Sequence, residues 1–337
     1  MKVGIVKGNG FSERWVEYCQ EKGIVYKLVD VYASDIVKQL EDCDFVLWHF
    51  SHVSYKDMLF AKQLLYSLQI AGKRVFPDFD TCWHFDDKVG QKYLLESVHA
   101  PLVPSYVFYT KKEALEWIKS VDFPKVFKLR GGAGASNVRL VRSRSQAKRL
   151  VRKAFGKGFS QINSWERLGE AFRLVKERKA SLWAIVLAIK AFFFPPEFSR
   201  MHGKEKGYAY FQDFIPQNDF DIRVIVTDNK AIAIKRMNRK NDFRASGSGY
   251  ILYDKNEIDI RCVKIAFEVN KKLQTQSIAY DFIFDSDNKP LIVELSYGYS
   301  MHGYDSCPGY WDEKLEWHEA ENIKPQYWQL ENLINER

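Results

Sequence analysis

The stretch from Tyr210 to Gly249 begins with β-forming residues, passes through a short polar break at 216–219 and returns as a segment in which hydrophobic and polar positions alternate. Its segment DIRVIVT predicts a strand with Ile222, Val224 and Val226 on one face and charged side chains on the other. An Asp-Asn pair at 228–229 favours a tight turn, after which β-forming residues return as a partner strand. The pattern therefore predicts an antiparallel hairpin.

Basic residues gather where this predicted hairpin ends. The return strand finishes near Lys235, Arg236 and Arg239, and the small residues ASGSG follow at 245–249. Small residues let backbone N–H groups approach an anion while arginine forks neutralise it, so the combination suits a polyphosphate. An ordinary hairpin with a solvated basic face is the alternative.

The first third of the chain alternates predicted strands with predicted helices. Strands are expected at 2–6, 24–29, 45–49 and 74–76, and helices at 12–22 and 55–70. This order predicts a parallel α/β sheet with ligands beyond the carboxyl ends of its strands. His49 and His52 favour substrate contact or plain surface over a metal site, because a third ligand is missing. The loop at 7–10 lacks the GxGxxG spacing of a dinucleotide site.

A lysine followed by a glycine-rich loop occurs in the middle of the chain. Asp86, Asp87 and Lys88 precede a helix predicted at 89–97. Further on, the predicted strand KVFKL leads into a loop of glycines, alanines and serine at 130–138. Such a loop wraps an anion while the lysine supplies a point charge. The Walker spacing is absent, and a simple glycine hairpin is the alternative.

Residues 145–206 interrupt this pattern with a basic helical stretch and a later apolar run, SLWAIVLAIKAFFF. The run is shorter than a bilayer span and contains Lys190, which disfavours a transmembrane helix. A buried helix or an oligomer contact is the favoured interpretation, because short apolar runs are usually core. Peripheral attachment to an anionic membrane is the alternative.

Two apolar strands near the end of the chain each contain one acid. They are predicted at 278–284 and 290–296, after a helix at 258–275. Acids such as Asp281 and Glu294 rarely sit among hydrophobic residues unless they are paired or bind a cation. Carboxylate oxygens suit magnesium, which shares them with substrate phosphates. Bonding to the backbone or to arginine is the alternative.

The composition is that of a folded protein with more than one lobe. A chain of 337 residues exceeds one ordinary core, and 46% hydrophobic with 28% charged residues excludes a disordered or fibrous protein. The net charge of +8 favours anionic partners without choosing among them. Five scattered cysteines indicate neither a disulfide framework nor a zinc site, and the N-terminus reads as a strand rather than an export signal. We therefore expect a cytoplasmic protein.

Together these motifs resemble the ATP-grasp carboxylate–amine ligases, especially the glutathione synthetase branch and the ligases that add glutamate to a ribosomal protein. The resemblance covers about residues 2–299 and follows the order and spacing of the motifs. It implies a fold of α/β and α+β type: an N-terminal parallel α/β domain at 1–85, a central ATP-grasp lobe at 86–209 that includes the basic insertion, and a C-terminal lobe with the tail at 210–337.

The same resemblance implies roles for individual residues. Those implied for ATP are Lys88, Lys128, Gly132, Gly134, Ala135, Ser136, Gln212, Asp213, Phe214, Ile215, Asp221, Lys235 and Ser246, with 212–215 as the adenine hinge and Asp221 beside the ribose. Arg223, Arg236 and Arg244 would stabilise the transferred phosphoryl group. Asp281, Glu294 and Ser296 would hold Mg²⁺ or Mn²⁺. The family usually has Glu-x-Asn on this last strand, so the shorter serine puts direct ligation in doubt.

The activity implied by the resemblance is ATP-dependent amide formation. A carboxylate takes the γ-phosphoryl group of ATP, and an amine then displaces phosphate from the acyl phosphate. The tail at 296–319 resembles ATP-grasp proteins of bacterial surface-polysaccharide gene clusters, so small or sugar-linked carboxylates and amines are the expected substrates. Its aromatic residues, Tyr297, Tyr299, Tyr304, Tyr310 and Trp311, together with His302 and Asp305, either line a substrate pocket or pack in the core.

Two other functions are compatible with these motifs. One is an amino-acid ligase that acts on a peptide or protein tail. The other is a non-catalytic nucleotide-binding scaffold that attaches to membranes or nucleic acid through residues 145–206. For the ligase we expect no nucleic-acid partner. Peripheral contact with the inner membrane face and oligomer formation both stay open at this point.

Overall fold

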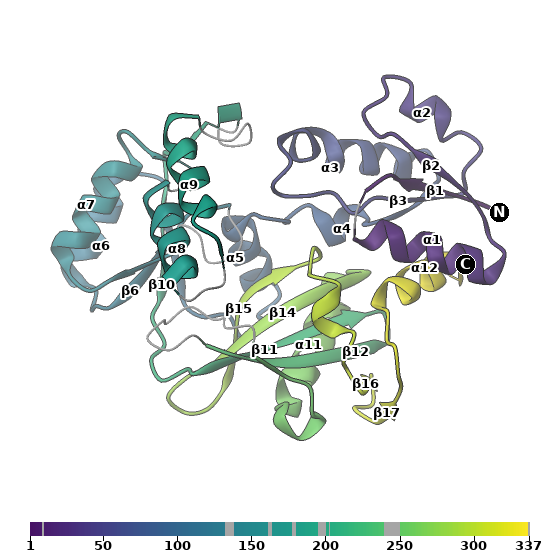
Figure 1. Ribbon diagram of the computed structural model, residues 1–337. Coiled ribbons are helices and arrows are strands. Elements are labelled where there is room, and N and C mark those ends of the chain that lie inside the picture. Colours follow the sequence, from purple (N-terminus) through teal and green to yellow (C-terminus); the bar gives the residue numbers. More distant parts are fainter. Residues whose placement is uncertain are drawn as a thin grey trace.

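Three larger sheets, each with its own helices, organise the chain (Figure 1). The computed structural model describes residues 1–8, 10–131, 138–160, 164–176, 180–194, 200–201, 203–238 and 250–335. No helix in these ranges is long and apolar enough to cross a membrane.

The N-terminal sheet is parallel, with strand order β2-β1-β3-β4. Its strands are β1 (Lys2–Val6), β2 (Val25–Val29), β3 (Phe45–Leu47) and β4 (Arg74–Phe76), and its helices are α1 (Phe11–Lys22), α2 (Ile36–Gln39), α3 (Tyr55–Ile70) and α4 (Phe79–Cys82). This arrangement confirms the predicted parallel α/β domain. The next helix, α5 (Lys88–Ser97), begins at the acidic pair as expected, since the Asp87 carboxylate accepts a hydrogen bond from the Gly90 N–H at 2.9 Å.

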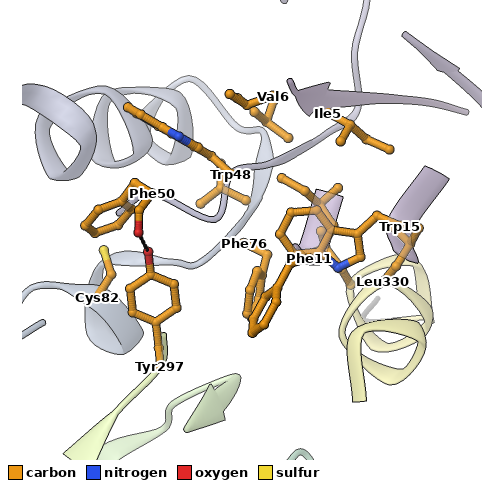
Figure 2. Packing of buried hydrophobic residues seen from close by; sticks show 14 of the residues in the cluster. Ile5, Val6, Phe11, Trp15, Trp48, Phe50, Phe76, Cys82, Tyr297 and Leu330 are labelled. Atoms are coloured by element: carbon orange, nitrogen blue, oxygen red, sulfur yellow. Dashed lines mark hydrogen bonds between the residues drawn. The ribbon is translucent and has the colours of Figure 1, made fainter. Parts of the chain in front are cut away.

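The core of this domain extends into the C-terminal part of the chain. Ile5, Trp15 and Phe76 pack with Leu330 of helix α12 (Pro325–Asn335), as Figure 2 shows. In the same cluster the Tyr297 hydroxyl donates a hydrogen bond to the Phe50 carbonyl at 2.9 Å. One hydrophobic core therefore joins the first and last segments of the chain, which lie side by side in Figure 1.

The central sheet is antiparallel, with strand order β5-β10-β6-β7. Its strands are β5 (Ser105–Phe108), β6 (Lys125–Lys128), β7 (Arg139–Val141) and β10 (Ala209–Asp213), and helices α6 (Lys111–Ser120) and α7 (Arg144–Ala154) contribute to its core. Two parts of the predicted domain division are therefore wrong. Strand β10 belongs to the central lobe, although most of it follows the boundary placed at 209/210. Helix α7 buries Ala147 and Val151 in the central core, so it is not part of an insertion.

An additional pair of helices follows in the chain, and it is flanked by two short strands. The strands are β8 (Phe159–Ser160) and β9 (Lys204–Glu205), and the helices are α8 (Ser164–Lys176) and α9 (Trp183–Phe193). Helices α8 and α9 pack against each other.

The C-terminal sheet follows the order β15-β14-β11-β12-β16-β17, with β13 beside β12. Its strands are β11 (Phe220–Thr227), β12 (Lys230–Met237), β13 (Ile251–Leu252), β14 (Ser277–Phe284), β15 (Pro290–Ser296), β16 (Gly309–Asp312) and β17 (Trp317–Glu319). Helix α11 (Ile260–Leu273) covers one face, where Ile222, Val224 and Val226 are buried as predicted. The opposite face carries Asp221 and Arg223, and it continues into the core shared with the N-terminal domain through Ile225.

Candidate functional site

A cavity of about 350 Å³ lies between the central and C-terminal sheets. It is lined by residues of β6, β10, β11, β12, β14 and β15, together with the segments that follow β10 and β15. Among its walls are these predicted site residues: Lys128, Gln212, Asp213, Phe214, Ile215, Asp221, Arg223, Arg236, Asp281, Glu294 and Ser296. Six others, Gly132, Gly134, Ala135, Ser136, Arg244 and Ser246, lie outside the described residues.

Strand register explains why side chains so distant in sequence meet here. Asp221 faces Arg236 across β11 and β12, Arg223 faces Asp281 across β11 and β14, and Asp281 faces Glu294 across β14 and β15. Directly opposed residues on neighbouring strands point to the same side of a sheet. The register therefore places three acids and two arginines on the cavity side of four neighbouring strands.

Ion pairs hold this row together. Arg223 makes a bidentate contact with Asp281, from Nε to Oδ1 at 2.5 Å and from Nη2 to Oδ2 at 2.7 Å. Arg236 lies with Nη2 3.0 Å from the same Asp281 Oδ2, and it also donates through Nε to Asp221 Oδ1 at 2.8 Å. Arg236 thus bridges two carboxylates, and each carboxylate has at least one guanidinium partner.

The two carboxylates respond differently to burial. Burial acts to raise the pKa of Asp281, but the guanidiniums of Arg223 and Arg236 outweigh it and hold that pKa well below its usual range. For Asp221 the effect of burial is larger than the opposing effect of the Arg236 guanidinium, so the pKa of Asp221 is raised. Asp281 is therefore a firmly ionised carboxylate, as a cation ligand must be.

Two buried lysines stand at the other side of the cavity. Lys128 donates from Nζ to Gln212 Oε1 at 2.5 Å, and burial lowers its pKa to about 8 despite the neighbouring Glu294 carboxylate. Lys88 is not part of the cavity lining, but its Nζ lies 2.9 Å from Glu294 Oε1. Burial opposes its charge, yet the Glu294 carboxylate more than compensates and raises the pKa of Lys88. Both lysines are predominantly cationic near neutral pH.

The chain was compared with known proteins by sequence and by structure. Residues 200–307 match the family model of the RimK-like ATP-grasp domain. No curated protein matches the chain by sequence. Structurally it is similar to a RimK-domain ATP-grasp protein from Sphaerobacter thermophilus, with 15% identity over 88% of this chain and 91% of that chain and a TM-score of 0.52.

Two further solved structures are similar at comparable identity. One is a D-alanine–D-alanine ligase from Bacillus anthracis complexed with ATP, with 12% identity over 89% of this chain and 87% of that chain and a TM-score of 0.55. The other is an N5-carboxyaminoimidazole ribonucleotide synthetase from Thermotoga maritima, with 12% identity over 99% of this chain and 76% of that chain and a TM-score of 0.61. The chain has an ATP-grasp fold. The fold class inferred from the sequence is thereby confirmed.

The apolar walls of the ATP-grasp cavity were missed by sequence reasoning. Val126, Ile283 and Val293 line it beside the 212–215 segment. A period of two could have found one of them, since Val126 precedes Lys128 by two positions and shares its side of β6. These walls leave room for a flat apolar group next to a row of charges, which is the composition of a nucleotide pocket.

Asn238 was also missed, although it follows Arg236 by two positions. Its Nδ2 donates to the Asn218 carbonyl at 2.7 Å. Its Oδ1 is buried and has no hydrogen-bond partner among the described residues. Because both asparagines line the cavity near Asp221, the Asn238 carbonyl oxygen is an acceptor available to a bound hydroxyl or amino group.

The placement of Lys235 corrects one prediction. Its strand partner is Ile222, whose side chain is in the core under α11, so Lys235 lies on the side of β12 away from the cavity. Its Nζ contacts Glu257 Oε2 at 2.7 Å and lies 4.3 Å from the centre of the Phe220 ring. Lys235 is therefore an outer-face residue and does not reach a nucleotide in the cavity.

Most of the aromatic tail belongs to the core. Tyr297, Tyr304 and Trp311 are buried in hydrophobic clusters, which favours the packing interpretation over the substrate pocket. Tyr299 is the one aromatic side chain of that set which lines the cavity, and it is itself buried. His302, Asp305 and Tyr310 are absent from the lining.

The predicted histidines also lie outside the cavity lining. His49 stacks on Phe11 with ring centres 3.9 Å apart, and burial lowers its pKa to about 4. His52 packs its ring edge against Phe85. Neither belongs to a group of three ligands for a metal, because the described residues contain only one such group, formed by Asp312, Glu316 and His318.

The donor set of the cavity fits a hard divalent cation. Asp281 and Glu294 face each other on neighbouring strands and carry the carboxylate oxygens that Mg²⁺ and Mn²⁺ prefer. In this structure Asp281 is paired with Arg223 and Arg236, as the alternative from the sequence has it, and Glu294 is paired with Lys88, so a cation would have to share these carboxylates with them. Ser296 is less suited, because its hydroxyl already bonds to the Gly298 backbone, donating at 3.1 Å and accepting at 3.2 Å. The fit therefore rests on the two carboxylates, and a serine ligand stays a prediction.

Proposed function

We propose that this ATP-grasp protein is an ADP-forming ligase that activates a carboxylate with ATP and joins it to an amine. The observation that carries the proposal is one cavity in which the buried Lys128 faces two opposed acids, Asp281 and Glu294, beside an apolar wall. A nucleotide needs an apolar slot, cations for its phosphates and oxygen ligands for its metal. All three are within one space of about 350 Å³.

Each part of the nucleotide has a matching part of the cavity. The base lies against Val126 and Ile283, where backbone groups of 212–215 read its edge. The ribose hydroxyls lie near Asp221 and the Asn238 oxygen, which accepts no hydrogen bond from the described part of the chain. Lys128, Arg223 and Arg236 line the cavity and receive the phosphates, and Lys88, behind the lining, adds positive charge through its ion pair with Glu294. When bound, Mg²⁺ or Mn²⁺ supplies charge neutralisation of the phosphates and would be held by Asp281 and Glu294.

The chemistry needs positioning and charge neutralisation rather than a protein nucleophile. A substrate carboxylate oxygen forms a bond to the γ-phosphorus as the bond to the ADP oxygen breaks. The amine nitrogen then forms the bond to the acyl carbon, inorganic phosphate leaves, and the nitrogen loses a proton. Arg223 and Arg236 neutralise oxygens that carry charge in both steps, and the carboxylates that pair with them fix their orientation.

Coupled turnover tests this proposal. Purified protein with magnesium ATP is expected to release ADP only when an acid and an amine are supplied together from a panel of candidates. ATP binding without ADP release across the panel would instead support a nucleotide-binding scaffold. ADP release that needs the acid but not the amine would contradict amide formation.

For the substrates, we extend the proposal to sugar-linked carboxylates and amines, with a peptide or protein tail as the rival acceptor. The support for the sugar class is the resemblance of the tail at 296–319, while the burial of its aromatic side chains removes the argument from a stacking pocket. The match of residues 200–307 to the RimK-like domain does not choose between the two acceptors. Two substrate pairs distinguish these acceptors: a uronic acid with an amino acid amine, and glutamate with a peptide. The pair that gives the faster ADP release identifies the substrate class.

A further inference from the structure

The α8–α9 pair exposes an apolar surface that none of the hydrophobic clusters among the described residues covers. On α9 and its flanks, Leu182 is 72% exposed, Trp183 is 64% exposed and Phe194 is 71% exposed. Val186, Leu187 and Ile189 are also exposed. These positions recur every three or four residues, so they form one broad helix face, which we call the α9 face.

The opposite side of α9 explains why this face points outward. Ala188 of α9 and Ala171 of α8 are buried, and such small residues let the two helices pack closely. Neither alanine belongs to any of the three large hydrophobic clusters formed by the described residues. The helix pair is thus a separate unit whose larger side chains remain in water, and an apolar surface of this kind is typical of an interaction site.

Positive charge accompanies the α9 face. Lys190 is exposed within it, between Val186 and Phe194 along the helix. At the base of the helix pair, Lys153 lies close enough to Arg139 and Lys204 for their charges to add to burial in lowering its pKa. The exposed Lys157 and Lys206 flank β8 and β9 there. We name Arg139, Lys153, Lys157, Lys204 and Lys206 the basal cluster.

We propose that the α9 face and the basal cluster bind the surface of an anionic lipid bilayer. Apolar side chains on a helix enter the interface between headgroups and acyl chains, and lysines around them contact lipid phosphates. Trp183 is a residue type that favours this boundary. The helix lies on the membrane and does not span it, since its 11 residues extend about 16 Å against a hydrocarbon thickness of about 30 Å.

Lys190 distinguishes this partner from a second copy of the chain. A dry interface between two copies would bury the Lys190 ammonium together with the apolar side chains around it, and an unpaired buried charge is strongly unfavourable. On a bilayer the long lysine side chain instead extends to the phosphates while its methylene groups remain in the apolar layer. The mixture of Lys190 with large apolar residues therefore fits a lipid surface better than a protein one.

Vesicle flotation tests the proposal with the full chain. Vesicles of phosphatidylglycerol and phosphatidylcholine in equal parts are compared with vesicles of phosphatidylcholine alone, at about 0.1 M and about 1 M salt, where the screening length falls from about 10 Å to about 3 Å. The protein is expected to float with the anionic vesicles at low salt. Binding is expected to weaken at high salt and with neutral vesicles.

Substitutions test whether vesicle binding depends on the α9 face or is non-specific adsorption. The double variant Val186→Asp/Leu187→Asp is expected to bind anionic vesicles at least about tenfold more weakly, because two apolar contacts are replaced by charges. Ile70→Asp, a matched change of an exposed residue on α3, is expected to bind like the wild type. Thermal melting checks that both variants are folded.

Three results would overturn the proposal. The wild type could stay with the soluble fraction for both vesicle types, or the double variant could float as well as the wild type. Sedimentation could also show a dimer that Val186→Asp/Leu187→Asp dissociates, which would identify the α9 face as an interface between copies. ADP release in the coupled assay is independent of all three, so failure here leaves the ligase proposal standing.

Discussion

At the scale of single residues, the cavity contains charges that water no longer stabilises. Lys128 illustrates the consequence: burial lowers its pKa to about 8, and its ammonium donates a hydrogen bond to the Gln212 amide oxygen. A group held in this way gains strongly when an anion arrives, because the phosphate restores the favourable environment that burial removed. This argues for Lys128 as a phosphate contact independently of any family resemblance.

Replacing Lys128 by Met is expected to weaken ATP binding by about 10- to 100-fold, the usual worth of a charge-assisted hydrogen bond. The melting temperature should change little, because the removed cost of burying the ammonium offsets the loss of the hydrogen bond to the buried Gln212 oxygen. Calorimetric titration with magnesium ATP measures the affinity. Lys235→Met is the matched control: that lysine lies on the outer face of β12, so its loss should leave ATP affinity unchanged. If Lys128→Met and Lys235→Met lost ATP affinity equally, the assignment of Lys128 to the cavity and of Lys235 to the outer face of β12 would be refuted.

A second residue-scale consequence concerns acid sensitivity. His84 is fully buried beside α5, and burial lowers its pKa to about 3, far below the usual value near 6.5. Between these two pH values the unfolded chain binds a proton that the folded chain does not, so the free energy of unfolding falls as the pH falls through this window. At pH 5 the loss attributable to His84 is about 2 kcal/mol.

Between pH 7 and pH 5 the free energy of unfolding of the wild type falls, and that of His84→Phe is therefore expected to fall by about 2 kcal/mol less. Urea denaturation at the two pH values measures the difference. His302→Phe, at an exposed ring, is the control and should follow the wild type. An identical pH dependence in His84→Phe and the wild type would show that His84 does not carry the effect.

At the scale of elements, local periodicity predicts where strands and helices lie along the chain. It does not predict which strands pair with one another. The alternation in 221–227 placed Ile222, Val224 and Val226 on the core side correctly, because a strand's period of two is a local property. The assignment of β10 to the central sheet depends on its pairing with β5, about a hundred positions earlier, which no local pattern reveals. The same limit applies to Lys235: a basic strand end is visible in the sequence, but only the register tells which of Lys235 and Arg236 faces the cavity.

The β16–β17 hairpin offers a test of close packing between elements. A Cβ at Gly309 would meet the His318 carbonyl oxygen at 2.3 Å and the Trp317 ring at 2.4 Å, so a larger residue would push the two strands apart. Gly309→Ala is expected to lower the free energy of unfolding by about 2–3 kcal/mol, the usual cost of overpacking. Gly303→Ala has nothing within 4 Å of the added carbon and should have almost no effect. Matching denaturation curves for the two variants would contradict this account of the strand contact.

At the scale of the whole molecule, the N-terminal domain is not independent of the rest. Its core includes Tyr297 after β15 and Leu330 on α12, so the two ends of the chain complete one hydrophobic cluster. The segment that follows the cavity also contacts the N-terminal domain. Tyr297 lies three positions after Glu294, and its hydroxyl donates a hydrogen bond to the Phe50 carbonyl of that domain. The predicted division at residue 85 separated parts that share a core, because the sequence pattern does not show which distant segments pack together.

This shared core predicts that the first and last segments unfold together. Leu330→Ala removes a fully buried side chain that packs beside Trp15, and it is expected to cost about 2–5 kcal/mol, the range for such core truncations. Because the cluster contains both segments, urea curves followed by far-ultraviolet circular dichroism and by tryptophan fluorescence should shift by the same amount and remain superimposable. Leu187→Ala, at an exposed position of α9, is the control and should change the midpoint little. If Leu330→Ala instead separated the two probes into distinct transitions, the N-terminal domain would fold on its own and the single core inferred from these contacts would be refuted.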